Sequence, residues 1–325
     1  MAEPAGKPLL IELGVEELPI GAVDTLARAL AEAVHAGLAG HGFALGAARH
    51  YGTPRRLAVH VQALASRQAD GETRALGPAV AAALDADGKP TPALRGFAAR
   101  QGVDIAALTR EATDKGERFV LVTQRVGQPL AVLLPEILAE AVKALPIPKP
   151  MRWGNHDYSF VRPLHWLVVL HGDEVIEAEL FGVHSTRHSR GHRFMADKPV
   201  WITDADAYVE ALRGAKVIAD PAQRRERIRG EVARVAAQLG GMPQMDDALL
   251  EQIANLTEWP VAIGCSFDAA FLAVPQEALV ATMVANQKFV PLLDGHGALL
   301  PRFIGVANIE SRDETQIRHG YERVI

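Results

Sequence analysis

The sequence has only one cysteine among its 325 residues, Cys265, so no disulfide can form within the chain. Such sparing use of cysteine is typical of a reducing compartment and predicts a cytoplasmic protein. No apolar run reaches the roughly 18–20 residues that a membrane-spanning helix needs. The N-terminal MAEPAGKPLLIEL also lacks the basic region and long apolar stretch of a secretory signal. We therefore expect no contact with a membrane.

Signatures of enzyme sites are missing as well. The sequence has no GxxxxGK[ST] phosphate loop, no GxGxxG after a predicted strand and no GxSxG elbow. Cys265 lies in the apolar segment VAIGCSF, which favours a core position over a nucleophile. Glu16 and Glu17 follow the first predicted strand, but one adjacent pair of carboxylates is weak evidence for acid–base catalysis. We identify no catalytic residue in this chain.

The length and the net charge of the chain are compatible with a protein of two lobes that carries local binding surfaces. The chain is 49% hydrophobic and 22% charged, as in ordinary globular proteins. Its length exceeds the ~250–300 residues at which single cores stop growing, which predicts two lobes. The net charge of −5 argues mildly against nucleic-acid binding over the whole surface. A local basic groove remains compatible with it, because steering depends on where the charges lie.

The apolar patterns predict strands and helices that alternate along the chain, with hairpin turns at Gly172–Asp173 and Asp294–Gly295. This mixture favours an α+β fold of two mixed lobes with antiparallel hairpins over a doubly wound parallel sheet. The segment KALPIPKP (143–150) has three prolines, which fit neither a helix interior nor a central strand. We place the lobe boundary there and predict lobes of residues 1–147 and 148–325. Strands are predicted at 8–13, 57–64, 117–125, 164–171, 174–181 and 260–267, a hairpin across 288–309, and helices at 20–41, 91–102, 130–145, 204–213, 221–239, 246–257 and 275–286.

The densest polar cluster is HSTRHSRGHR (184–193), a predicted loop. Its arginines Arg187, Arg190 and Arg193 can present guanidinium forks to phosphates, although a solvated loop explains them equally well. Histidines recur every fourth residue in this loop, which is the spacing of metal ligands on a helix. The interleaved arginines would repel a cation, so we expect no metal site.

Two further segments carry candidate binding residues. In PKPMRWG (148–154), a cation beside Trp153 can hold a phosphate while the indole stacks on an unpaired base. The alternative is that Trp153 plugs the lobe junction and the cations reach water. In the predicted helix 221–239, arginines such as Arg224 and Arg225 flank an apolar stripe, where most such side chains are merely solvated.

Several strings in this sequence together resemble one known family, the β subunit of two-subunit bacterial glycyl-tRNA synthetase. The resemblance covers nearly the whole chain, and LPIPKPMRWG and RGHRFM are its most specific strings. In order, the strings are GVEELP (14–19), TPRRLA (53–58), TDKGE (113–117), LPIPKPMRWG (145–154), RGHRFM (190–195), KVIAD (216–220) and NQKFVP (286–291).

The resemblance implies a non-catalytic part of a glycine–tRNA ligase. In that family the α subunit carries the class II core and uses ATP, Mg²⁺ and glycine, while the β subunit binds tRNA(Gly) within an α2β2 tetramer. This chain alone is then expected to be inactive, and HD-like and anticodon-binding domains are expected beyond Ile325. Part of the family's N-terminal half is similar to the B3/B4 region of phenylalanyl-tRNA synthetase β, which leaves hydrolysis of mischarged tRNA as an alternative function. The candidate tRNA-binding residues are Lys149, Arg152, Trp153, Arg187, Arg190, His192, Arg193, Arg224 and Arg225.

Overall fold

A computed structural model describes residues 6–114 and 116–325 of the chain. The chain forms two compact units, of which the smaller is Arg67–Leu130. The larger unit comprises the residues up to Ser66 together with Ala131–Ile325. Each unit is described by itself.

The first sheet of the larger unit is built around β1 (Lys7–Val15), whose apolar run KPLLIELGV is buried on both faces. A strand with such a run belongs in the middle of a sheet that is covered on both sides. β1 pairs antiparallel with β3 (Arg56–Leu64) and β9 (Leu164–His171), at the positions where the patterns predict strands. The strand order is β11-β12-β9-β1-β3-β2, where β2 is Ala48–Thr53, β11 is Glu179–Leu180 and β12 is Val183–Thr186.

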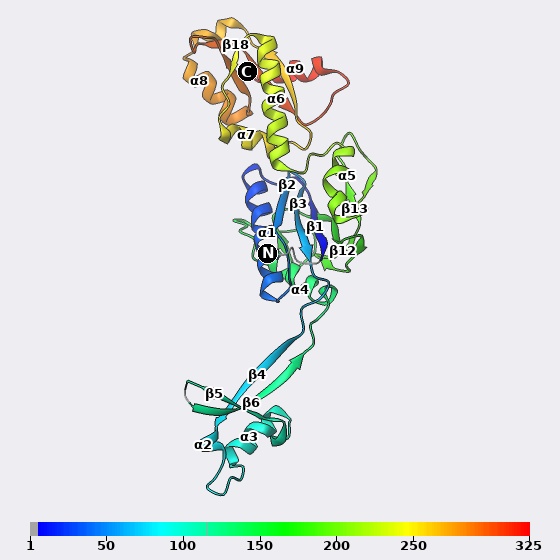
Figure 1. Ribbon diagram of the computed structural model, residues 1–325. Helices are drawn as coiled ribbons and strands as arrows, with labels where there is room; N and C mark the ends of the chain where they lie inside the picture. The colour runs from blue at the N-terminus through cyan, green and yellow to red at the C-terminus, as the bar shows by residue number, and fades with distance from the viewer. Residues whose placement is uncertain (1–5, 115) are drawn as a thin grey trace. The chain divides into compact units, whose positions relative to one another are not determined.

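Helices cover both faces of this sheet. α1 (Val23–Gly40) lies against β2 and β3, and α5 (Tyr208–Gly214) lies on the opposite side (Figure 1). Tyr208 and Leu212 of α5 are buried in a cluster with Leu10, which places them on the face away from α1. The predicted helices at 20–41 and 204–213 are therefore confirmed.

The hairpin predicted at Gly172–Asp173 forms only in part. Gly172 has a φ of +60°, and β10, which is only Glu174–Val175, pairs with β9. The chain then leaves the edge of β9, and residues 179–180 pair with β12 instead. The 174–181 strand was therefore predicted too long, because an exposed stretch of alternating residues does not reveal where pairing ends.

A second sheet lies in the C-terminal half of the larger unit, with strand order β15-β17-β18-β16 and antiparallel pairing throughout. α6 and α7 bury apolar side chains on one face, and Tyr321 of α9 packs over Gly305. The predicted helices, the 260–267 strand and the hairpin turn at Asp294–Gly295 are confirmed. The elements are α6 (Pro221–Leu239), β15 (Met242–Pro243), α7 (Asp247–Ala254), β16 (Val261–Ser266), α8 (Gln276–Ala281), β17 (Val290–Leu293), β18 (Leu299–Ala307) and α9 (Glu314–Glu322).

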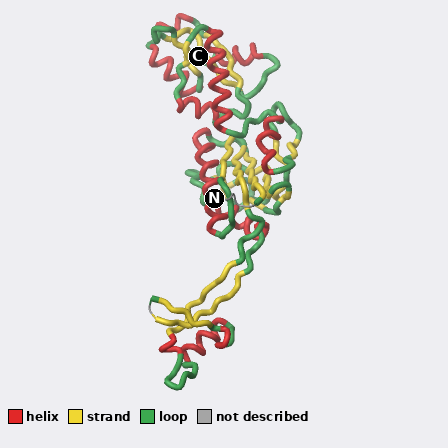
Figure 2. Tube along the Cα trace, viewed as in Figure 1, coloured by secondary structure: helices red, strands yellow, loops and turns green. Residues whose placement is uncertain are grey.

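The smaller unit is a sheet with helices on one side (Figure 2). Its strand order is β4-β6-β5, and α3 (Pro92–Gln101) buries Leu94 and Phe97 against the sheet. The helix predicted at 91–102 is confirmed. It ends at Gly102, which has a φ of +68° that other residues adopt with difficulty. The strands are β4 (Gly71–Ala79), β5 (Thr109–Thr113) and β6 (Gly116–Arg125).

These units divide at residues 66/67 and 130/131, whereas the proline run lies inside the larger unit. The prolines follow α4 (Leu130–Lys143) and stand between that helix and β7 (Met151–Arg152). The division into lobes at 147/148 stays a prediction. The α+β class with antiparallel hairpins is confirmed by both sheets and by the helices that cover them.

One arginine fixes α6 to the rest of the larger unit. Arg224 is fully buried, and its guanidinium donates to the carbonyls of Ala254 at 2.8 Å, Ile218 at 2.6 Å and Gly52 at 2.6 Å. Burial lowers its pKa to about 10, so the side chain stays charged at neutral pH. Its position on the flank of the apolar stripe suggests a surface residue, but the structure places it where no phosphate can reach it.

We expect Arg224→Ala to lower the free energy of unfolding by about 3 kcal/mol or more, because several buried carbonyls lose their donor together. Arg229→Ala on the same helix removes an equal charge from an exposed position and should change stability by at most ~0.5 kcal/mol. Urea unfolding of both variants measures the difference. Equal stabilities for the two variants would contradict this role of Arg224.

Candidate functional site

A buried charge cluster lies at the centre of the larger unit, around Arg56 of β3. Its Nη1 lies 3.1 Å from Oε1 of Glu12 on β1, and its Nε donates to Oε1 of Glu258 at 3.1 Å. Glu258 lies in the loop after α7, and Thr53 of β2 donates to the same oxygen at 2.6 Å. Arg56 Nη1 also donates to the carbonyl of Arg190 at 2.9 Å. All these side chains except Arg190 are buried.

The two carboxylates of the cluster have pKa values that are shifted in opposite directions. Burial raises the pKa of Glu12 above its usual value, although Arg56 and Ser189 oppose the shift. Burial acts on Glu258 in the same sense, but Arg56 and the Thr53 hydroxyl outweigh it and hold the pKa of Glu258 below its usual value. Both carboxylates raise the pKa of Arg56. The loop after α7 is therefore joined to the first sheet by a charged contact that excludes water.

Beside this cluster is an open pocket of about 490 Å³. Gly191 is part of its wall, and Cβ atoms of Ala196 and Ala215 lie within 3 Å of where a side chain on Gly191 would begin. The guanidinium groups of Arg55 and Arg190 lie 5.7 and 5.3 Å from the Trp166 ring centroid, so the buried indole supports both. The polar side chains that line the pocket are Glu16, Arg55, His165, Arg190, Arg193 and Asp197.

Arg55 is the unusual member of this pocket. The residue is only 8% exposed, and its Nε is buried with no hydrogen-bond acceptor in the part of the chain that the structure describes. Burial lowers its pKa, while Glu258 and Glu16 support its charge. A buried donor of a charged group is costly unless it is paired. Arg55 also lines the pocket, so it contributes positive charge that would favour an anion there.

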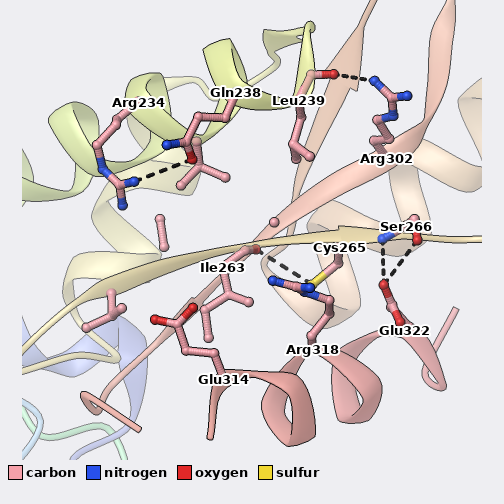
Figure 3. Close-up of a pocket in the computed structure, with 14 residues that line it drawn as sticks. Arg234, Gln238, Leu239, Ile263, Cys265, Ser266, Arg302, Glu314, Arg318 and Glu322 are labelled. Atoms are coloured by element: carbon pink, nitrogen blue, oxygen red, sulfur yellow. Dashed lines mark hydrogen bonds between the residues drawn. The ribbon is translucent and has the colours of Figure 1, made fainter. Parts of the chain in front are cut away.

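A second cleft of about 370 Å³ lies between α6 and α9 over β16 (Figure 3). Two of its three arginines already have partners, because Arg302 donates to the Leu239 carbonyl and Arg234 pairs with Glu231 at 3.0 Å. Cys265 is buried at its base, and burial raises the pKa of the thiol to about 12, which leaves it protonated and unreactive at neutral pH. The predicted core position of Cys265 is confirmed. Among the described residues, no set of three or more His, Cys, Asp or Glu side chains is arranged to hold a metal.

Comparison with known proteins adds the family. The family model described as glycyl-tRNA synthetase beta subunit matches residues 9–325. The chain belongs to this family. It is 53% identical over 320 residues to the glycine–tRNA ligase beta subunit of Xanthomonas campestris pv. campestris (strain B100), covering 98% of this chain and 46% of that protein. The corresponding proteins of Xylella fastidiosa (strain M12) and Chromohalobacter salexigens are 51% and 47% identical, with 98% and 99% of this chain covered and 44% and 46% of theirs. The chain spans about half the length of the curated relatives it matches.

Family membership confirms the resemblance stated from the sequence strings, and several of those strings meet at the pocket. GVEELP supplies Glu16, TPRRLA supplies Arg55, and RGHRFM supplies Arg190 and Arg193. No helix among the described residues has both the length and the apolar character to cross a membrane. The similarity of part of the family to the phenylalanyl-tRNA synthetase B3/B4 region stays an expectation.

The residues predicted from the basic loop have different surroundings. Arg190 and Arg193 line the pocket, whereas His192 is buried and receives a hydrogen bond from the Phe194 N–H on Nδ1 at 3.3 Å. Arg187 stacks on Trp201 and donates to the carbonyl of Asp173 at 2.5 Å, away from the pocket lining. Most of the loop that the sequence predicts instead forms two short strands, β12 and β13 (His188–Arg190), while residues 191–193 lie outside any strand.

The residues of the proline-bounded turn do not line this pocket. Lys149 lies at an apolar hollow with Pro19 and Leu26, and Arg152 is exposed on β7. Trp153 is half-buried, and its indole N–H donates to the Phe160 carbonyl at 3.0 Å. Their role in tRNA binding stays a prediction, as does that of the half-buried Arg225.

Sequence reasoning passed over Arg55, His165 and Glu16 as parts of a common site. The paired arginines that follow the turn at Thr53–Pro54 are the one signal that could have drawn attention to Arg55. Nothing in the string distinguishes Arg55, which lies in the turn between β2 and β3 and lines the pocket, from Arg56, the first residue of β3, which lies in the core.

We expect Glu258→Gln to lower the free energy of unfolding by about 3 kcal/mol at neutral pH, since Arg56 loses one of its buried counter-charges. A lowered folded pKa stabilises the fold above the ordinary value of 4.5, and this contribution disappears as the pH falls through the folded pKa. The variant should therefore lose less stability than the parent between pH 5 and pH 3 (about the range of carboxylate titration). Urea unfolding at several pH values tests this, with Glu251→Gln on the exposed side of α7 as the control. A parallel acid profile for Glu258→Gln and the parent would contradict it.

Proposed function

We propose that this chain is the tRNA-binding part of a glycine–tRNA ligase β subunit and that its arginine pocket holds a backbone phosphate of tRNA(Gly). The observation that carries the proposal is a pocket lined by three arginines, Arg55, Arg190 and Arg193, of which the guanidinium groups of Arg55 and Arg190 have no hydrogen-bonded counter-charge among the described residues. Arginine forks match phosphate oxygens in geometry and charge, and most protein contacts to nucleic-acid backbones are of this kind.

Preorganisation supports the same conclusion. Arg55 and Arg190 lie against the buried indole of Trp166, so their guanidinium groups lose little conformational freedom when a phosphate binds. The Arg190 backbone is held by Arg56, which connects the pocket rim to the buried cluster. Such a site positions an RNA backbone without reading its bases.

In this proposal the chemistry of charging belongs to the α subunit, which uses ATP and Mg²⁺ to attach glycine to the tRNA that the β subunit holds. The two subunits act in the cytoplasm as an α2β2 tetramer. Among its described lining residues, the pocket has no nucleophile with a paired base, and its polar side chains are three arginines, His165 and two carboxylates. No specific observation favours hydrolysis of mischarged tRNA.

The test is a salt titration of tRNA(Gly) affinity in the full-length β subunit with its α partner. Arg55→Ala and Arg190→Ala should each weaken binding about tenfold or more, since a hydrogen bond to a charged group contributes about 1.5–3 kcal/mol. Each should also flatten the dependence of log affinity on log salt by up to ~0.7–0.9 per lost phosphate contact.

Arg229→Ala is the matched control, because it removes one positive charge from an exposed position on α6. It should leave the affinity within about twofold if the pocket, rather than net charge, holds the RNA. Thermal melts show whether each variant stays folded. Folded pocket variants that bind tRNA as well as the control does would refute the proposed function.

A further inference from the structure

The arginine pocket already contains an anion of its own, the carboxylate of Glu16. One oxygen, Oε1, lies 3.0 Å from Nη1 of Arg193, and the other, Oε2, lies 3.1 Å from Nε2 of His165. The Glu16 backbone is fixed, because its N–H donates to the Pro163 carbonyl at 3.1 Å. This carboxylate therefore occupies the position that an incoming phosphate oxygen would take on Arg193.

The other arginines of the pocket are in a different state. The guanidinium groups of Arg55 and Arg190 contact the Trp166 ring but form no hydrogen bond or ion pair with any of the described residues. The pocket thus has two cations without a hydrogen-bonded counter-charge among the described residues, and a third that is paired with Glu16. Glu17 is a weaker neighbour of Arg193, at 3.6 Å and with 63% of its side chain exposed, compared with 37% for Glu16.

We propose that Glu16 is a built-in competitor of the phosphate and sets the selectivity of the pocket against small single anions. The inference rests on the proposed function of the pocket. An anion that binds Arg193 must first displace the Glu16 carboxylate. The new ion pair between the anion and Arg193 therefore replaces an existing ion pair of nearly equal strength. A small anion makes no further interaction that would offset this exchange. An RNA backbone is held at neighbouring phosphates as well, and it can displace Glu16 locally while remaining bound.

The charge of Glu16 is present throughout the physiological pH range. Burial by itself would raise the pKa of Glu16, but Arg193 and His165 outweigh burial and hold the pKa below its usual value. Because the side chain is partly exposed, the pair can open to water without unfolding the loop. Glu16 can therefore act as an exchangeable partner and is not a fixed part of the buried cluster.

The experiment compares Glu16→Gln with the parent in the full-length β subunit with its α partner, using tRNA(Gly) and inorganic phosphate as probes. We expect tRNA to bind about threefold to tenfold more tightly to Glu16→Gln at low salt, with a steeper salt dependence by up to ~0.7–0.9 because Arg193 becomes available. Inorganic phosphate competes with tRNA in both proteins. After correction for each protein's tRNA affinity, the phosphate concentration that displaces tRNA should be severalfold lower for Glu16→Gln than for the parent. Glu16→Ala should show the same changes in tRNA affinity and in displacement by phosphate.

Glu17→Gln is the matched control and should stay within about twofold of the parent in both measurements, because Glu17 is farther from Arg193 and more exposed. Unchanged or weaker tRNA binding by folded Glu16→Gln would overturn the inference. If Arg55→Ala and Arg190→Ala weaken binding while Glu16→Gln does not strengthen it, only the selectivity role fails. If the arginine variants bind normally, the pocket itself is not the tRNA site.

Discussion

Arg56 is a positive charge without access to water, and the larger unit is organised around satisfying it. Glu12 on the central strand and Glu258 in the loop after α7 lie on either side of its guanidinium, while the Arg190 carbonyl and the Ser189 hydroxyl complete its contacts. Taking these charges out of water is expensive, so the arrangement persists only with all partners in place. The cluster therefore fixes the positions of segments far apart in sequence.

The charges of the neighbouring pocket depend on which side chains Arg56 contacts. Glu12 and Glu258 each accept a hydrogen bond from Arg56, and neither accepts one from the neighbouring Arg55. Arg55 is left with the Trp166 face and long-range attraction to Glu258 and Glu16. Glu16, at the end of β1, is the direct counter-charge in the pocket, and it pairs with Arg193. The pocket beside the buried cluster is thus lined by three arginines, while Glu16 and Asp197 are its only carboxylates among the described lining residues.

Arg224 shows the same principle with neutral partners. Its guanidinium binds the backbone of three segments at once, through carbonyls of residues 52, 218 and 254. A planar group with fixed donor directions can satisfy several carbonyls simultaneously, which the point charge of a lysine cannot do. Together, Arg56 and Arg224 join the first sheet to the helices and sheet that follow residue 220.

The sequence by itself determined the α+β class, the family and most of the regular elements, because these depend on local apolar patterns and on contiguous strings. It also determined the cation-rich character of RGHRFM and TPRRLA. Only the tertiary structure decided which cations are available. Arg55 and Arg56 are neighbours in one string, and Arg224 has the helical position of a surface residue. Arg56 and Arg224 are nevertheless fully buried, while Arg55 keeps 8% exposure and lines a pocket. An arginine's role depends on the acceptors it meets, and those acceptors come from segments up to about two hundred residues away, such as Glu258 for Arg56.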